Sequence, residues 1–337
     1  MVTRVHTPRR ARPRPSVLPA IGACLAAAVL LAGACAVPAP PRGVSPASRT
    51  RHAKPEPKVR GHSAGARATA AVPSFSHVAI VVMENHEYGQ IIGNADAPYI
   101  NHLAHRYGLV THSYAIGHPS LPNYLSLIGG STFGITSDCT TCTVGGTNLV
   151  DQLVRHGKTW RAYMEDLPYP CFPGPSYNRY AKKHDPFLYF DDIRTVASRC
   201  AGVVPLKRLD VALSKGSLPD FLFVSPNLCH DMHDCSVRTG DTFLKQRIPP
   251  LLSALGPKGV LFLTWDEGAT SAGCCKKAGG GHVVTIVAGP AAKAGARSGY
   301  SYDAYSILRT IEEGWGFSLL RGARCSCTRA LRAFLRP

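Results

Sequence analysis

From about residue 76 onward, two hydrophobic patterns alternate along the chain. One is the continuous apolar run, rich in β-branched residues, that is typical of a strand buried on both faces of a sheet. It occurs at residues 77–83, 160–164, 221–225, 259–265 and 282–288, and a shorter strand is predicted at 109–114. The other is helical spacing of apolar residues, which occurs at 98–107, 121–128, 149–156, 242–255 and 303–313. Strands separated by helices predict an α/β fold with a mostly parallel central sheet and helices on both faces.

Local signals refine some of these elements. Gly129-Gly130 predicts the end of the helix at 121–128, and Pro249-Pro250 is expected to interrupt the helix at 242–255. Asp303 is expected to cap the last helix. The segment 165–200 is rich in Tyr, Pro, Phe and Asp and is too irregular for a sheet, so we predict a lid or an insertion there.

The first 73 residues have a different character. Five arginines precede an almost uninterrupted apolar run at 17–36 that ends in small residues. This pattern predicts a cleaved signal peptide over residues 1–36 and secretion of the protein. A lipoprotein acylated on Cys35 and a retained membrane anchor are the alternatives. A disordered Pro-, Ala- and Arg-rich linker is predicted over residues 37–73, which leaves one globular domain over 74–337.

The net charge of the 337-residue chain is +17, which would suggest nucleic-acid binding if it were spread over the globular part. However, residues 1–72 carry 12 of the 38 Lys and Arg residues and only one acidic residue. The remainder is mildly basic, enough to attract an anionic substrate. It has no stripe of interleaved basic and aromatic residues, so we expect no nucleic-acid partner.

Twelve cysteines occur, and ten remain when the two in the predicted signal peptide are removed. An even number in an exported protein predicts disulfides. The candidate pairs are Cys139/Cys142, Cys171/Cys200 and Cys229/Cys235. The spacing of the first pair also suits a zinc site, but no second pair at matching spacing accompanies it.

Polar side chains follow four of the predicted strands at the point where each strand ends. These polar segments are residues 84–86, 118–123, 226–234 and 266–268. Because ligands of such sheets bind beyond the carboxyl ends of the strands, we expect these side chains to form one site.

Ser120 directly precedes the predicted helix at 121–128 and therefore stands at a helix N-terminus. A serine at this position either only caps the helix or acts as a nucleophile toward phosphorus, since the free N–H groups of a helix N-terminus bind phosphate. We predict the second role, in which the Asn123 amide helps to hold the non-bridging phosphate oxygens.

Glu84, Asn85, Asp266 and Glu267 offer only oxygen ligands, which favour a hard divalent metal ion. Such an ion would activate the Ser120 hydroxyl and neutralise charge on the phosphoryl group. Its identity is left open. The alternative for Asp266 and Glu267 is a solvated pair in a turn, but both directly follow a wholly apolar strand, where unpaired carboxylates are costly.

Four histidines are candidates for the site. His230 and His233 belong to a dense polar cluster that can hold a second metal, protonate the leaving group, or pack around the Cys229/Cys235 pair. His118 and His282 are candidates for contacts with the phosphate or the leaving group, with a purely structural role as the alternative for each.

The segment 78–138 contains VVMENHEYGQIIG, APYINHLA and HPSLPNYLSLIGG, and a Trp-Asp-Glu-Gly turn follows at 265–268. In combination these motifs resemble the bacterial phosphoesterase family, which contains secreted acid phosphatases, among them phosphatidylinositol-3-phosphatases, and non-specific phospholipases C. The resemblance implies an alkaline-phosphatase-like fold and a phosphoserine intermediate on Ser120. It also implies metal binding by Glu84, Asn85, Ser120, Asp266 and Glu267.

Two details of the resemblance bear on single residues. The Ser-x-Pro-Asn turn is similar to the Thr-x-Pro-Asn turn of nucleotide pyrophosphatases, in which the Asn binds phosphate, and this supports Asn123. Two-metal enzymes of the superfamily have Asp-His where this chain has Asp266-Glu267, which leaves the number of metal ions open.

The expected function is therefore that of a secreted phosphomonoesterase acting on phosphorylated small molecules or phosphoinositides. A phosphodiesterase or phospholipase C using the same site is one alternative, and a catalytically inactive cell-surface binding module is another. A lipid substrate and transient contact with a membrane would require exposed apolar side chains near the site. The candidates are Phe172, Tyr177, Phe187 and Tyr189, with ordinary packing as the alternative.

Overall fold

The computed structural model describes residues 71–275 and 278–337. The predicted signal peptide, Cys35 and nearly all of the predicted linker lie outside the described residues. In the described part of the chain, no helix combines the length and the apolar character needed to span a bilayer.

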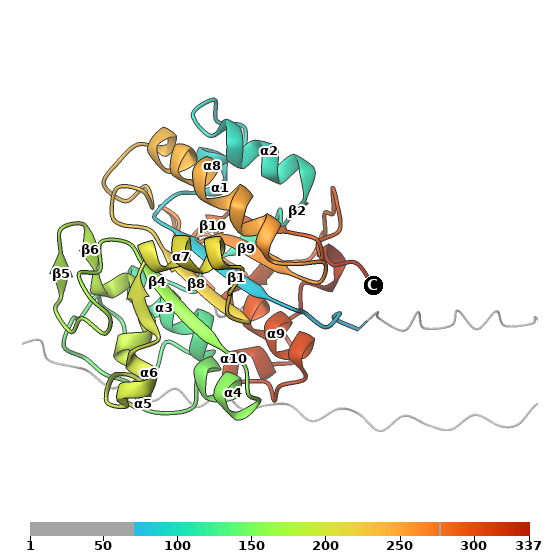
Figure 1. Ribbon diagram of the computed structural model, residues 1–337. Helices are drawn as coiled ribbons and strands as arrows, with labels where there is room; N and C mark the ends of the chain where they lie inside the picture. The colour runs from blue at the N-terminus through green and yellow to red at the C-terminus, as the bar shows by residue number, and fades with distance from the viewer. Residues whose placement is uncertain (1–70, 276–277) are drawn as a thin grey trace, which may run out of the picture. The chain divides into compact units, whose positions relative to one another are not determined.

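A seven-stranded sheet forms the centre of the described body (Figure 1). In order across the sheet, its strands are β2 (Gly108–Leu109), β11 (Thr285–Ala288), β9 (Val260–Trp265), β1 (Val78–Met83), β8 (Phe221–Ser225), β4 (Trp160–Met164) and β7 (Val203–Pro205). The five strands from β9 to β7 are parallel, and β11 runs antiparallel to both of its neighbours. Every residue of β1 and β9 is buried, as their continuous apolar sequences predict.

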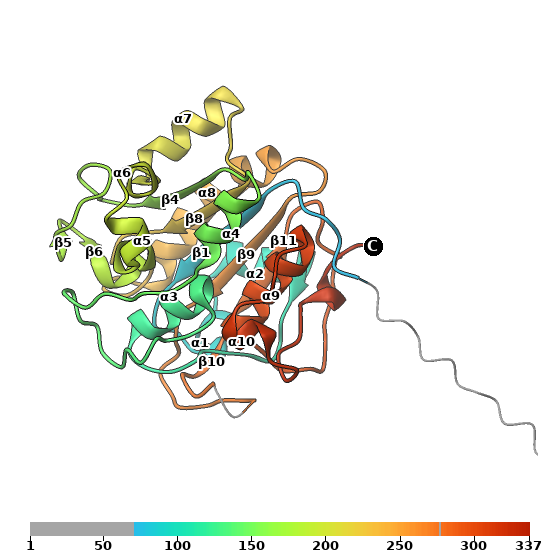
Figure 2. The same cartoon turned by 90° about the horizontal axis from the view of Figure 1, so that it is seen from below.

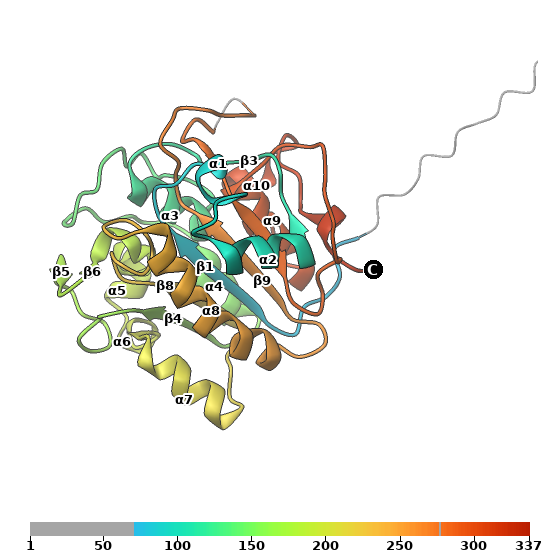
Figure 3. The ribbon, with the colours of Figure 1, turned by 90° about the horizontal axis from the view of Figure 1, so that it is seen from above.

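Helices cover both faces of this sheet. One face packs against α2 (Pro98–Arg106), α7 (Lys207–Lys215) and α8 (Val237–Ala254), as Figure 3 shows from above. The other packs against α3 (Ser120–Gly129), α4 (Leu149–Arg155) and α9 (Ala304–Trp315), as Figure 2 shows from below. The predicted α/β fold with a mostly parallel, doubly covered sheet is confirmed.

Smaller elements complete the described body. A second sheet contains β10 (His282–Val283), β3 (Ser113–Tyr114) and β12 (Tyr302–Asp303), and a two-stranded hairpin contains β5 (Ser176–Tyr177) and β6 (Tyr180–Ala181). The short helices are α1 (Tyr88–Ile91), α5 (Asp191–Arg194), α6 (Ala197–Cys200) and α10 (Arg321–Arg324), with 3₁₀ turns η1 (Lys182–His184), η2 (Pro186–Tyr189) and η3 (Arg332–Phe334).

The predicted strands at 109–114 and 282–288 are each divided between two sheets. β2 pairs with β11 in the main sheet, and β3 pairs with β10 in the small one. The two runs remain partners and change sheet together. Apolar periodicity does not show such a break, because both halves of each run stay buried or nearly so.

Helix ends follow the predicted signals, with one exception. Gly130 ends α3 in a left-handed conformation (φ 69°), and the Asp303 side chain accepts a hydrogen bond from the Ser306 N–H at the start of α9. Helix α8, however, continues through Pro249 and Pro250 to Ala254, so the predicted interruption is wrong. The helix is capped by Ser236 and buries a long apolar stripe, and this tertiary packing outweighs the loss of backbone hydrogen bonds at the prolines.

The irregular segment 165–200 contains β5, β6, η1, η2, α5 and α6. Phe187 and Tyr189 are completely buried in the main core, so the idea that they are exposed near the site is wrong. Tyr177 is exposed and Phe172 is partly buried. The sequence does not show which of these aromatic side chains are buried, because the tertiary packing of η2 against α3 and the sheet decides it.

Disulfides link Cys139–Cys142, Cys171–Cys200 and Cys229–Cys235, which confirms the three candidate pairs. Two further bridges, Cys274–Cys275 and Cys325–Cys327, were not predicted. Five disulfides are typical of a protein that folds outside the reducing cytoplasm.

Candidate active site

The carboxyl ends of β1, β8 and β9 meet at one edge of the sheet because these strands are parallel neighbours. Glu84 follows β1 directly, and its backbone N–H donates to the carbonyl of Asp231, in the loop after β8, at 2.9 Å. Asp266 follows β9, and its N–H donates to the carbonyl of Met83, also at 2.9 Å. Three carboxyl groups from three strands are thereby brought together, and all three are buried.

Ser120 is the first residue of α3, and its side chain is 1% exposed. Its hydroxyl lies 3.2 Å from Oε2 of Glu84 and 3.1 Å from Oε1 of Glu267. A hydroxyl held between two carboxylates is poised to lose its proton. The hydroxyl also lies at a helix N-terminus, where a transferred phosphoryl group meets positive potential.

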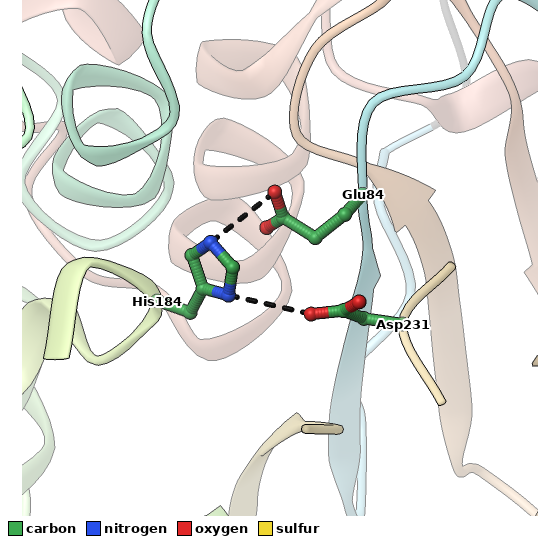
Figure 4. A group of neighbouring side chains, drawn as sticks. All are labelled: Glu84, His184 and Asp231. Atoms are coloured by element: carbon green, nitrogen blue, oxygen red, sulfur yellow. Dashed lines mark ion pairs between the residues drawn. The ribbon is translucent and has the colours of Figure 1, made fainter. Parts of the chain in front are cut away.

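Next to Ser120 lies a cluster that includes a histidine from the irregular segment. The His184 ring lies between Glu84 and Asp231, with Nε2 3.3 Å from Glu84 Oε2 and Nδ1 3.3 Å from Asp231 Oδ2 (Figure 4). Ligand atoms of these three buried residues all lie within 4.8 Å of one another. The ring is stacked on Tyr124, whose hydroxyl donates to Glu84.

The protonation equilibria of this cluster are strongly displaced. Burial raises the pKa of Glu84, and the nearby carboxylates of Asp266 and Asp231 raise it further. Burial likewise raises the pKa values of Asp231 and Asp266 to about 8 each. Burial lowers the pKa of His184, and the neighbouring cation of Lys183 lowers it further. Without a cation among them, the carboxylates resist ionisation and the imidazole stays neutral.

The residues present fit a divalent cation. Four buried polar atoms in the described part of the chain lack a hydrogen-bond partner at this place: Asn85 Oδ1, Asp231 Oδ2, Asp266 Oδ2 and His184 Nε2. Buried polar atoms are rarely left unpaired in folded proteins. Carboxylate and amide oxygens with a neutral imidazole form a suitable donor set for a divalent ion, and such an ion would keep the carboxyls ionised.

Asn85 takes part in the cluster through its backbone. Its φ of 50° is in the left-handed region, which asparagine tolerates better than most residues, and its N–H lies 3.3 Å from Asp266 Oδ1. The structure therefore brings together Glu84, Asn85, Ser120, Asp266 and Glu267, the five residues expected at a metal site.

Charged groups lie beside the cluster. Lys183 Nζ lies 3.1 Å from Asp138 Oδ2 and 3.2 Å from Nε2 of His233. Burial alone would lower the pKa of Lys183, but the Asp138 carboxylate raises it, so the ammonium stays charged. Asp138 also accepts a hydrogen bond of 3.0 Å from the N–H of Leu121, in the first turn of α3.

His118 is held by two acceptors, a carboxylate oxygen of Glu267 and the carbonyl of Thr270. Burial lowers the pKa of His118, but these hydrogen bonds and the charge of Glu267 raise it overall. Through its contact with Glu267, which also lies 3.1 Å from the Ser120 hydroxyl, His118 orients this carboxylate toward Ser120.

Three further candidate residues have clear structural contacts. The Asn123 side chain bonds to the backbone of Ile116, Gly117 and Pro119, so it shapes the turn before Ser120. His230 pairs with Glu165 and stacks on Phe243 at 4.8 Å between ring centroids.

His282 contacts the carbonyl of Thr111 and stacks on Tyr88. Within the described part of the chain, no contact joins His230 or His282 to the carboxylate cluster. Their catalytic roles, and phosphate binding by Asn123, stay predictions.

Sequence patterns did not single out His184, Lys183, Asp138 or Tyr124. Lys183 and His184 lie in an irregular segment about 100 residues from Glu84, where no strand end indicates a site. Tyr124 follows Ser120 by one helical turn, and this i, i+4 spacing was the available signal, because it places both on one face of α3.

Comparison with known proteins agrees with this geometry. The model of the Phosphoesterase family matches residues 94–318. A phosphatidylinositol-3-phosphatase from Mycobacterium tuberculosis is 35% identical over 253 residues, which cover 74% of this chain and 80% of that protein. An acid phosphatase from Aspergillus fumigatus is 28% identical over 260 residues, or 73% of this chain and 56% of that protein. The matched region thus spans little more than half of the fungal enzyme.

Solved structures support the fold. A protein of the alkaline phosphatase superfamily from Vibrio parahaemolyticus has a TM-score of 0.52 at 12% identity, covering 76% of this chain and 71% of that chain. The lipoteichoic acid synthase LtaP from Listeria monocytogenes has a TM-score of 0.53 at 10% identity, covering 75% of each chain. The predicted alkaline-phosphatase-like fold is confirmed. The chain belongs to the phosphoesterase family and is a hydrolase of phosphoric ester bonds.

Proposed function

We propose that the protein is a secreted, metal-dependent phosphomonoesterase that uses Ser120 as its nucleophile. The observation that carries this proposal is the position of the Ser120 hydroxyl, at a helix N-terminus and within 3.2 Å of carboxylates from two strands. Support comes from the names of the relatives, which are phosphatases. The five disulfides and the predicted signal peptide support secretion.

In this proposal Glu84, Asn85, Asp266 and Glu267 hold a divalent ion with Ser120, and His184 and Asp231 complete the site around Glu84. When bound, the ion neutralises charge on the phosphoryl oxygens and lowers the pKa of the serine hydroxyl.

The reaction proceeds in two steps. Ser120 Oγ attacks phosphorus as its proton passes to Glu267, and the ester P–O bond breaks. The leaving oxygen takes a proton from the Lys183–His233 pair and departs as an alcohol. Water then attacks the phosphoserine, returning one proton to that pair, while the Ser120 oxygen recovers its proton from Glu267. Inorganic phosphate is released and every group regains its starting protonation state.

A monoester is favoured over a diester by the charges around the site. Besides the divalent ion, the charged ammonium of Lys183 lies beside the site, and this positive charge suits the dianion of a phosphate monoester better than the single charge of a diester. His118 holds Glu267, and Asn123 holds the turn before Ser120.

Phosphoinositides are the proposed lipid substrates. Tyr169 and Tyr177 are 53% and 47% exposed and flank Phe172, with ring centroids 5.3 and 6.1 Å from it. The hairpin β5–β6 that carries Tyr177 leads directly into η1, which supplies Lys183 and His184. Tyrosines favour the interface between water and lipid, so this surface suits transient contact with a membrane.

The test is hydrolysis of p-nitrophenyl phosphate and of its bis-ester by the full chain, beside two serine variants on the same helix. Ser120→Ala is expected to reduce monoester turnover by about 1000-fold or more. Ser126→Ala is the matched control, because its hydroxyl donates to the carbonyl of Pro122 and contacts none of the site carboxylates. Faster turnover of the bis-ester would make the protein a phosphodiesterase. Unchanged monoester turnover in Ser120→Ala would remove the serine mechanism.

A further inference from the structure

A second cavity lies far from the carboxylate cluster, between α7 and the strands β4 and β7. It has a volume of about 660 Å³ and is lined by Arg161, Arg208 and Lys215, together with apolar side chains such as Val204 and Leu218. None of the residues that line it is acidic. The cavity therefore combines three positive charges with an apolar wall.

These three cations have no acidic partner in the described part of the chain. Arg161 donates only to the carbonyl of Trp160, at 2.8 Å, and neither Arg208 nor Lys215 forms an ion pair there. Two acids near α7 and at the start of β8 are already paired. Asp210 on α7 pairs with Arg247, and Asp220 pairs with Lys158.

Tyr163 is an independent sign that the cavity takes a ligand. It lines the cavity and is 2% exposed, yet its hydroxyl forms no hydrogen bond with any described residue. Tyr163 and Arg161 are two residues apart on β4 and so point to the same face of the sheet. Burial raises the pKa of Tyr163 to about 12, so the hydroxyl remains a hydrogen-bond donor. Because Tyr163 lines the cavity, this donor is available to a ligand there.

We propose that this cavity is a second anion site, which binds an organic phosphate through Arg161, Arg208, Lys215 and the Tyr163 hydroxyl. Three cations without a carboxylate suit a dianionic phosphate better than a monoanionic carboxylate, and guanidinium groups bind phosphate in a bidentate manner. A phosphate alone fills only a small part of the cavity. Its apolar wall accommodates an attached organic group.

The site is separate from the catalytic one. Arg161 is the second residue of β4, and the cavity also includes Thr159 and Pro219, which precede β4 and β8. The carboxylate cluster lies beyond the opposite ends of these parallel strands. A five-residue strand spans about 16 Å, so one ligand of this size does not occupy both sites. The proposal does not depend on the serine mechanism.

The test is calorimetric titration of phenylphosphonate, which has no ester bond to hydrolyse, into the full chain in the presence of a chelator. Removal of divalent ions takes away the cation that would hold an anion at the catalytic edge. One binding event is expected, at least tenfold weaker in Arg161→Gln, Arg208→Gln and Tyr163→Phe. Arg155→Gln, an exposed cation on α4 at the other face of the sheet, is expected to bind as the wild type does.

Turnover of p-nitrophenyl phosphate with metal restored checks that each variant is folded, and it is expected to be unchanged. Vesicles of phosphatidylcholine with and without phosphatidic acid identify the source of the phosphate. Sedimentation with the anionic vesicles that is lost in Arg208→Gln indicates a lipid headgroup, and no sedimentation indicates a soluble organic phosphate. Absence of phenylphosphonate binding, or equal binding by wild type and all variants, would overturn the proposal.

Discussion

The two ends of the central sheet gather ionisable groups of opposite kind, carboxyl groups at one end and cations at the other. At the carboxyl ends of the strands, Glu84, Asp231 and Asp266 are buried within reach of one another. At the other end, Arg161 and Arg208 border a cavity that contains no acid. Buried like charges are costly, so the first arrangement by itself requires a cation. Exposed cations cost little, so the second gains significance only from Tyr163, a residue that is 2% exposed and lines the same cavity.

The largest effect is expected from breaking the charge balance at the carboxylate end. Chelation of divalent ions is expected to lower phosphatase turnover by about 1000-fold, because the ion contributes several kcal/mol to the transition state. In Asp231→Asn, the affinity for the activating ion is expected to fall by about 10- to 100-fold. Losses of this size are seen even when the mutated group only forms a hydrogen bond to a metal ligand.

The ion affinity is read from activity against free metal concentration and from calorimetry of the resting protein. Asp96→Asn is the control, because Asp96 is an exposed acid paired with Arg238. Equal ion affinities of the wild type and Asp231→Asn would mean that the metal site excludes Asp231.

A smaller effect is expected from two histidines that lie three residues apart in the same loop. His233 contacts Lys183 beside the cluster, whereas His230 pairs with Glu165 and stacks on Phe243. His233→Asn is expected to lower kcat for an alkyl phosphate by about 100-fold, as for the loss of a general acid. The loss is expected to be much smaller for p-nitrophenyl phosphate, whose leaving group is stable as an anion.

His230→Asn is expected to affect both substrates equally and only slightly. If His233→Asn also lowers both rates by the same factor, then His233 does not deliver the proton to the leaving group.

The smallest effect on activity is expected for Glu312, a buried carboxyl that lies outside both ends of the sheet and acts on stability instead. Burial raises the pKa of Glu312 to about 8, although hydrogen bonds and two arginines oppose the shift. The folded protein therefore binds this proton more tightly than the unfolded chain, whose glutamate titrates near 4.3. The resulting stabilisation is complete at low pH and is lost as pH rises from about 4.5 to 8.

Glu312→Gln keeps an acceptor for the Leu320 N–H and removes the titration. The free energy of unfolding of this variant minus that of the wild type is expected to increase as pH rises through that window. The slope is up to about 1.4 kcal/mol per pH unit. Denaturant unfolding at pH 5 and pH 8 measures this difference. Glu313→Gln, which removes a carboxylate already paired with Arg309 and Arg332, is the control, and it should not reproduce that pH dependence. A wild-type-like pH dependence in Glu312→Gln would show that Glu312 is ionised in the folded protein.

Much of the fold was accessible from the sequence because its strong strands are continuous apolar runs. The runs at 160–164 and 221–225 coincide with β4 and β8. Prediction failed where packing decides between local alternatives. Pro249 and Pro250 lie inside α8, although prolines usually end a helix. The run at 282–288 changes sheet in its middle. Nothing in the local sequence indicates either feature.

For the site, the sequence by itself determined which residues directly follow β1 and β9, and thereby that Glu84, Asp266 and Glu267 share one edge of the sheet. Parallel strands impose this, since their carboxyl ends all point the same way. Only the tertiary structure decided that His184 lies between Glu84 and Asp231, and that Phe187 and Tyr189 are buried while Tyr177 is exposed. These contacts join segments far apart in the chain, and side-chain packing fixes them without leaving any periodic pattern in the sequence.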